Sequence, residues 1–198
     1  MGKAFTEEER LEIRKQIMQM AYKLFTQRGV KKVTIREITS QIGIAQGSFY
    51  SFFEDKNALL FAIMGEEHQR KIEHVLNLLP GSEEDPIDFI KEILLHNSKN
   101  IYNSEIFWEE RKDILYILSR RSEKENAMIN NRNKAALNQM LDYWKAHGKE
   151  VQVDAERLLG ALHATSCLAM NQAYIGSEFK NIYLNTVQFL ITQCVWVK

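Results

Sequence analysis

The sequence contains few cysteines, and it has no long run of apolar residues. Two cysteines in 198 residues are too few for a disulfide scaffold. The apolar neighbours of Cys167 and Cys194 indicate buried free thiols, with redox sensing as the alternative. No run of 18 apolar residues occurs, and the first residues lack the apolar segment of an export signal. We therefore expect a cytoplasmic protein without a membrane span.

Prolines and glycines are also scarce, so that long helices can form without interruption. The chain has two prolines and nine glycines, and both prolines fall in the segment PGSEEDP at 80–86, which marks the clearest break. The first helix is predicted to begin at Thr6, which forms a capping box with Glu9. Strand-like alternation of apolar and polar residues is absent. The sequence therefore predicts an all-α protein of about nine helices, with those beyond the break at about 86–102, 105–119, 122–147, 153–175 and 179–197.

The net charge is zero, but the charged residues are unevenly distributed. Residues 1–60 hold ten Lys or Arg against seven Asp or Glu, whereas the remainder holds 16 against 19. This small offset favours, but only slightly, a DNA-facing N-terminal end.

Residues 34–56, TIREITSQIGIAQGSFYSFFEDK, have the pattern of two short helices joined by a glycine turn. Ile35, Ile38 and Ile42 recur at helical spacing, and Gly43 follows where the first helix must end. Three aromatic residues of the second helix can pack on the same core: Phe49, Phe52 and Phe53. This arrangement predicts a helix-turn-helix, whose second helix can enter the major groove of DNA. The apolar pattern alone also fits any corner between two helices.

About a dozen residues within positions 13–64 stand at a characteristic spacing: Ile17, Ala21, Leu24, Phe25, Gly29, Thr34, Ile38, Gly43, Gly47, Tyr50, Phe53, Lys56 and Leu59. At this spacing the segment resembles the N-terminal domain of the tetracycline-repressor (TetR) family of bacterial transcriptional regulators. Beyond residue 65 the resemblance covers only the layout of the helices. Two residues depart from the family pattern. Thr39 stands where a small alanine often lets the two helices approach, and Ala45 where Ser or Thr often begins the recognition helix.

The side-chain chemistry of the motif, together with the positions that match the family, predicts which residues contact DNA. Thr34 is expected to cap the first motif helix beside a phosphate, and Gln46 has a side chain able to pair with adenine. Gly47 permits close approach of the backbone, whereas Tyr50 and Lys56 resemble the family's phosphate clamps. The full assigned set is Thr34, Arg36, Ala45, Gln46, Gly47, Ser48, Tyr50 and Lys56.

The resemblance implies a ligand-responsive DNA-binding regulator, most simply a repressor that a small apolar effector releases from a palindromic operator. The expected organisation is a helix-turn-helix domain at 1–55, a connecting helix at 56–79, and a ligand-binding and dimerisation domain at 80–198. A DNA-binding regulator or architectural protein without an effector is the alternative.

A homodimer is expected through the last two helices. Apolar residues surround most of the final helix, and this apolar surface is larger than one chain should bury. The alternative is that these residues form a purely intramolecular core. The residues assigned to the dimer interface are Leu158, Leu162, Ala169, Ala173, Tyr183, Val187, Leu190 and Ile191.

An effector pocket is expected among the helices between 86 and 175, where aromatic and methionine side chains are dense. The assigned residues are Tyr102, Phe107, Trp108, Tyr116, Met140, Trp144, His163, Met170 and Asn171. His163 lies in an apolar run, so a hydrogen-bonded core histidine is its other interpretation.

An enzyme is disfavoured. The five histidines lack the Glu-x-x-His spacing of a di-iron bundle, and no phosphate-binding glycine loop, nucleophile motif or Cys-x-x-Cys pair occurs. We therefore predict no catalytic residues, no metal site and no cofactor.

Overall fold

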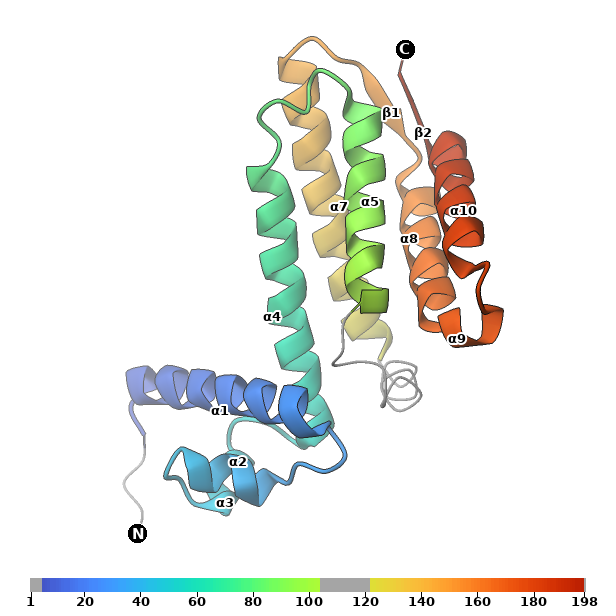
Figure 1. Cartoon of the computed structure of the whole chain (residues 1–198). Helices are drawn as coiled ribbons and strands as arrows, with labels where there is room; N and C mark the ends of the chain where they lie inside the picture. Colours follow the sequence, from blue (N-terminus) through green and yellow to red (C-terminus); the bar gives the residue numbers. More distant parts are fainter. Residues whose placement is uncertain (1–4, 104–121, 198) are drawn as a thin grey trace. The chain divides into compact units, whose positions relative to one another are not determined.

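The computed structural model describes residues 5–103 and 122–197, and these residues are almost entirely helical (Figure 1). The all-α prediction is confirmed. The helices are α1 (Glu7–Arg28), α2 (Ile35–Gln41), α3 (Gln46–Phe49), α4 (Lys56–Asn77), α5 (Pro86–Asn103), α7 (Glu123–Ala146), α8 (Ala155–Met170), α9 (Gln172–Ile175) and α10 (Phe179–Cys194). The helix expected at 105–119 lies outside the described residues. No described helix has both the length and the apolar character needed to cross a membrane.

The chain divides into two compact units, each with its own apolar core. The first contains the described residues up to Gln69, and the second contains those from Arg70 onward. The division therefore falls inside α4.

The first unit is built from α1, α2, α3 and the first part of α4. As predicted, Thr6 and Glu9 form a capping box at the start of α1: the Thr6 hydroxyl accepts from the Glu9 N–H, and the Glu9 carboxylate accepts from the Thr6 N–H. Gly29, with φ +83°, ends the helix. The buried core consists of Ile17, Met18, Ala21, Phe25, Val30, Val33, Ile38, Phe49, Phe53, Leu59, Leu60 and Ile63.

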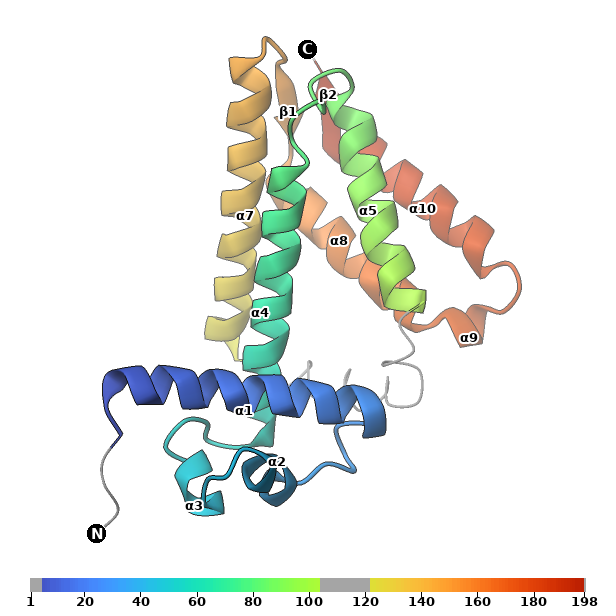
Figure 2. The same ribbon diagram turned by 60° about the vertical axis from the view of Figure 1, so that its left-hand side comes forward.

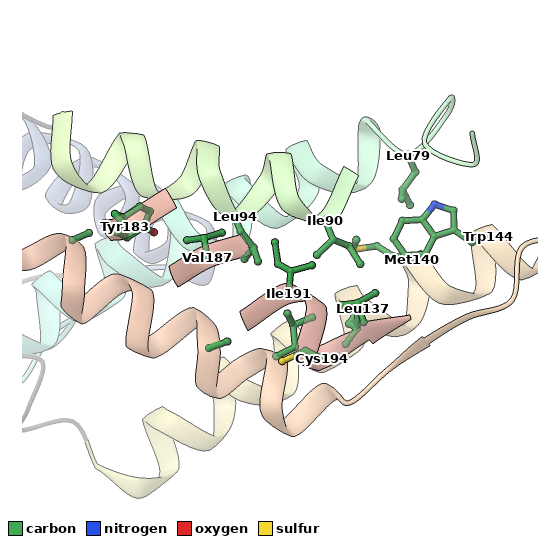
Figure 3. Close-up of a cluster of buried hydrophobic side chains, with 14 of the residues drawn as sticks. Leu79, Ile90, Leu94, Leu137, Met140, Trp144, Tyr183, Val187, Ile191 and Cys194 are labelled. Carbon is green, nitrogen blue, oxygen red and sulfur yellow. The ribbon is translucent and has the colours of Figure 1, made fainter. Parts of the chain in front are cut away.

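The second unit is a bundle in which α5, α8 and α10 pack on one another and α7 packs on α8 (Figure 2). Buried side chains from α5, α7 and α10 meet in its core, together with Leu79 (Figure 3). Ser122 and Glu125 form another capping box at the start of α7, and Gly148, with φ +76°, follows its end. Trp144 is completely buried there, and its indole N–H donates to the Ser82 hydroxyl at 2.8 Å.

A short pair of strands corrects the expected ends of two helices. β1 (Val151–Val153) pairs antiparallel with β2 (Val195–Val197), so the final helix stops at Cys194 instead of 197, and α8 starts at Ala155. Valine is favoured in strands, and the Asp154 N–H donates to the Cys194 carbonyl at the end of the pair. Three residues are too few for alternation to be detected in the sequence.

Candidate nucleic-acid interface

The predicted glycine turn is present between α2 and α3. Gly43 adopts φ +75°, a conformation that favours glycine, and the Ile44 N–H donates to the Thr39 carbonyl at 3.0 Å. The side chain of Phe49 has no exposed surface, and that of Phe53 is buried beside it. The helix-turn-helix prediction is thus confirmed.

The start of α2 is fixed by a cluster of polar groups. Thr34 is the N-cap, as predicted, and its hydroxyl accepts from the Glu37 N–H. The Glu37 carboxylate accepts from the Thr34 N–H at 2.8 Å and from the Arg28 guanidinium at 2.7 Å. The Thr34 backbone bond, followed by the Arg28 bond, lowers the pKa of Glu37 to about 2. This carboxylate therefore stays ionised and holds the cap of α2 at neutral pH.

The second motif helix, α3, is only four residues long and has no side-chain cap at Ala45. Ala45, Gln46 and Gly47 are exposed, and Tyr50, which follows the helix, is 55% exposed. A Cβ added at Gly47 would meet no other atom within 4 Å. Packing within the chain therefore does not require glycine here, and the position leaves room for a ligand to approach the backbone closely.

The other side chains assigned to DNA are at least partly accessible to solvent. Arg36 is exposed on α2 and Ser48 is half-buried on α3. The Thr39 hydroxyl is buried between the helices and donates to the carbonyls of Ile35 and Arg36, both at 3.1 Å. This departure from a small alanine is accommodated by bonds to its own helix.

Lys56 differs from the other assigned residues. It is half-buried, and its ammonium donates to the carbonyls of Val30 at 2.7 Å and Val33 at 3.0 Å. Both acceptors belong to the loop between α1 and α2. The role of the full set in binding DNA stays a prediction.

Two arginines of α1, which were not predicted from the sequence, also contact the motif. The Arg10 guanidinium donates to the Ser51 carbonyl at 2.9 Å and lies 5.1 Å from the centre of the Phe52 ring. Arg14 lies 4.4 Å from the centre of the Phe53 ring. The sequence did contain a signal for these contacts. Arg10 and Arg14 are spaced four residues apart on α1, and the two aromatic residues are adjacent.

The residues assigned to the effector pocket are only partly described. Met140 and Trp144 lie in the core of the second unit. His163 and Asn171 are exposed, so the interpretation of His163 as a core residue is wrong, because it lies on the outer face of α8. Phe107, Trp108 and Tyr116 lie outside the described residues, as do the side chains of Tyr102 and Met170. The pocket itself stays a prediction.

Most residues assigned to the dimer interface instead belong to the chain's own core. Five of them are buried within the chain itself: Leu158, Ala169, Tyr183, Val187 and Ile191. Leu162 and Leu190 are half-buried, and the side chain of Ala173 lies outside the described residues. These five side chains leave little surface for a second chain, and the role of the assigned residues at a dimer interface stays a prediction. The prediction of two buried thiols is half correct, since Cys194 is buried and Cys167 is exposed.

The exposed apolar side chains of this region lie elsewhere on α10 and β2. Phe189 is 62% exposed, and Ile182 and Trp196 are each more than two-fifths exposed. On α8, the outward positions include Gly160, Ala164 and Cys167, which recur at helical spacing. These residues could not be told from the core by sequence, because apolar residues surround most of α10.

Comparison with known proteins finds a family model that matches part of the first unit. Residues 17–63 match the family model described as "Bacterial regulatory proteins, tetR family". The chain is 29% identical over 118 residues to the HTH-type transcriptional regulator AcrR of Shigella flexneri, covering 60% of this chain and 53% of that protein. The chain thus spans about half the length of this curated relative.

Solved structures share the fold of nearly the whole chain. A TetR-family transcriptional regulator from Pectobacterium atrosepticum has a TM-score of 0.68 at 19% identity, covering 94% of each chain. Thermus thermophilus FadR, described as a TetR-family transcriptional repressor in complex with lauroyl-CoA, has a TM-score of 0.66 at 14% identity, covering 90% of this chain and 91% of that one. The fold of both units is therefore that of these regulators.

Proposed function

We propose that this chain, which belongs to the tetR family of bacterial regulatory proteins, is a DNA-binding transcriptional regulator, most simply a repressor at a palindromic operator. The observation that carries this proposal is the helix-turn-helix of the first unit. Its core residues Ile38, Phe49 and Phe53 are buried. Arg36, Gln46 and Tyr50, in contrast, are exposed around the turn and the second helix. Such side chains can contact phosphates and base edges in the major groove. A DNA-binding role also implies the cytoplasm, where bacterial DNA lies.

We propose that the protein acts as a homodimer. One recognition helix reads few base pairs, and a two-fold dimer doubles the site. The exposed apolar residues Ile182, Phe189 and Trp196, with the small outward residues of α8, support an interface on this face. Sedimentation at micromolar concentration should give a dimer, and a monomer at that concentration would contradict the proposal.

A small apolar effector is proposed to bind the second unit and to lower the affinity for DNA. The presence of lauroyl-CoA in the FadR complex supports an acyl compound as the first candidate. An effector can shift the equilibrium only by its differential affinity for two states, which is commonly about 5–150-fold. A regulator or architectural protein without an effector remains the second candidate, since the match to the family model lies wholly within residues 17–63.

Selection from a randomised DNA library tests both parts of the proposal. The purified protein should enrich duplexes that share a palindromic sequence, and lauroyl-CoA should weaken binding to the selected duplex. If lauroyl-CoA releases the protein from DNA at concentrations below its critical micelle concentration, this result supports an acyl effector. Unchanged binding with this compound and with extracted metabolites favours the second candidate, and failure to enrich any sequence overturns the proposed function.

A further inference from the structure

Lys56 occupies a position that the sequence assigns to a phosphate, but its ammonium lies against the protein's own backbone. We propose that Lys56 is a positioning residue that anchors the loop between α1 and α2, and that it affects DNA binding through this loop instead of through a phosphate contact. The inference rests on the proposed function for its effect on DNA, whereas the anchor itself does not.

The contacts of the ammonium define the anchor. Its Nζ donates to the Val30 carbonyl at 2.7 Å and to the Val33 carbonyl at 3.0 Å, 26 and 23 residues away in the sequence. Both lengths lie within the range of ordinary hydrogen bonds, and a charged donor makes such bonds stronger than a neutral one. One side chain therefore ties α4 to both ends of a four-residue segment.

The position of Lys56 in its helix agrees with this role. Lys56 is the first residue of α4, where the helix dipole disfavours a cation unless negative charge lies nearby. Two carbonyl oxygens supply partial negative charge at that place. The matched position predicts a phosphate at this site, but these acceptors stabilise the cation without DNA.

The anchored loop determines where the first motif helix begins. Val30 and Val33 are both buried in the core of the first unit, and Val33 directly precedes Thr34, the N-cap of α2. The ammonium thus fixes the backbone on one side of the cap, while Glu37 and Arg28 fix the cap itself. The two carbonyl bonds occupy two of the three N–H donors of the ammonium, so removing the ammonium would release the loop backbone beside the cap.

The substitution Lys56→Met separates the two roles, because it keeps most of the apolar stem and removes the ammonium. The probe is a duplex that the wild-type protein selects from a randomised library. Binding is measured between about 50 and about 200 mM salt, where the loss of one phosphate contact lowers the slope of log affinity against log salt by about 0.9. All measurements are made well below the melting temperature of the variant.

We expect Lys56→Met to weaken binding about tenfold with an unchanged salt slope, and to lower the melting temperature by about 3–10 °C. Lys56→Arg keeps the charge, but its planar guanidinium replaces a compact ammonium, so it should restore binding only in part. A slope reduced by about 0.9, with full rescue by arginine, identifies a phosphate contact and overturns the proposal. Unchanged affinity and unchanged melting temperature also overturn it.

Lys32→Met is the matched control, since Lys32 is an exposed lysine of the same loop. It removes the same charge and should leave the melting temperature unchanged. If Lys56→Met does not fold, the side-chain ammonium signal of Lys56 in wild-type protein replaces it. This signal should be protected from exchange and unmoved by the duplex, and a large shift on adding the duplex overturns the proposal. Failure of the wild type to select DNA contradicts the proposed function, while the melting temperatures still test the anchor.

Discussion

The helix-turn-helix and the terminal helices expose different chemistry. Around α2 and α3 the exposed side chains are polar or cationic, with Tyr50 as the main aromatic surface, whereas α10 and β2 expose Ile182, Phe189 and Trp196. The first surface suits a polyanion, and the second suits an apolar partner. The difference supports two proposed roles. The first unit would bind nucleic acid, and the second unit would bury its exposed apolar face against an apolar partner.

The largest effect is expected at Phe49, whose side chain has no exposed surface. Phe49→Ala should lower the free energy of unfolding by about 3–5 kcal/mol, because it leaves a cavity beneath α3. It should also abolish DNA binding, since the four-residue α3 depends on this packing. Thermal and denaturant unfolding measure the change. A loss below about 1 kcal/mol would contradict the packing of this helix.

Phe189 on α10 is the counterpart of Phe49 on the apolar surface of the second unit. Its side chain is 62% exposed within one chain. Phe189→Glu should leave the unfolding of the monomer nearly unchanged and weaken the dimer, because a charge would be buried in an apolar interface. The expected loss is about 2 kcal/mol or more of association free energy, measured by sedimentation equilibrium. An unaltered dimer would show that α10 does not form the interface through this face.

A smaller and more selective effect is expected on the polar surface. Gln46→Ala should cost about 1–3 kcal/mol at one base position and relax the preference there. Tyr50→Phe should instead weaken binding to all sequences alike. Competition between the selected duplex and its single-base variants distinguishes these outcomes. If Gln46→Ala kept the full preference, the assignment of Gln46 to base recognition would be wrong.

The smallest effect is expected from acid at the cap of α2. The pKa of Glu37 is about 2 in the folded protein and 4.5 for an ordinary glutamate. Its stabilising contribution is thus present above pH 4.5 and is lost as the pH falls toward about 2. Glu37→Gln should be less stable than the wild type near neutral pH, and the two melting temperatures should converge in acid. A constant difference between them would contradict this assignment.

The sequence predicts the helix-turn-helix well because its determinants are local. Gly43 ends α2, Thr34 and Glu37 lie three residues apart, and the apolar residues recur within single helices. The anchor at Lys56 could not be predicted, since its acceptors lie more than twenty residues away. The burial of Tyr183, Val187 and Ile191 on α10 could not be predicted for a similar reason. An apolar helix does not reveal which face the rest of its own chain covers, and only the packing of α5 and α8 against α10 decides this.

The mass of the complex with a selected duplex decides whether the protein binds DNA as a two-fold dimer. We expect selection to yield a palindromic sequence and each half-site to bind one chain, so that the complex contains two chains related by two-fold symmetry. Disrupting one half-site should then weaken binding strongly. A single chain bound to an asymmetric sequence, or no enriched sequence at all, would contradict the account.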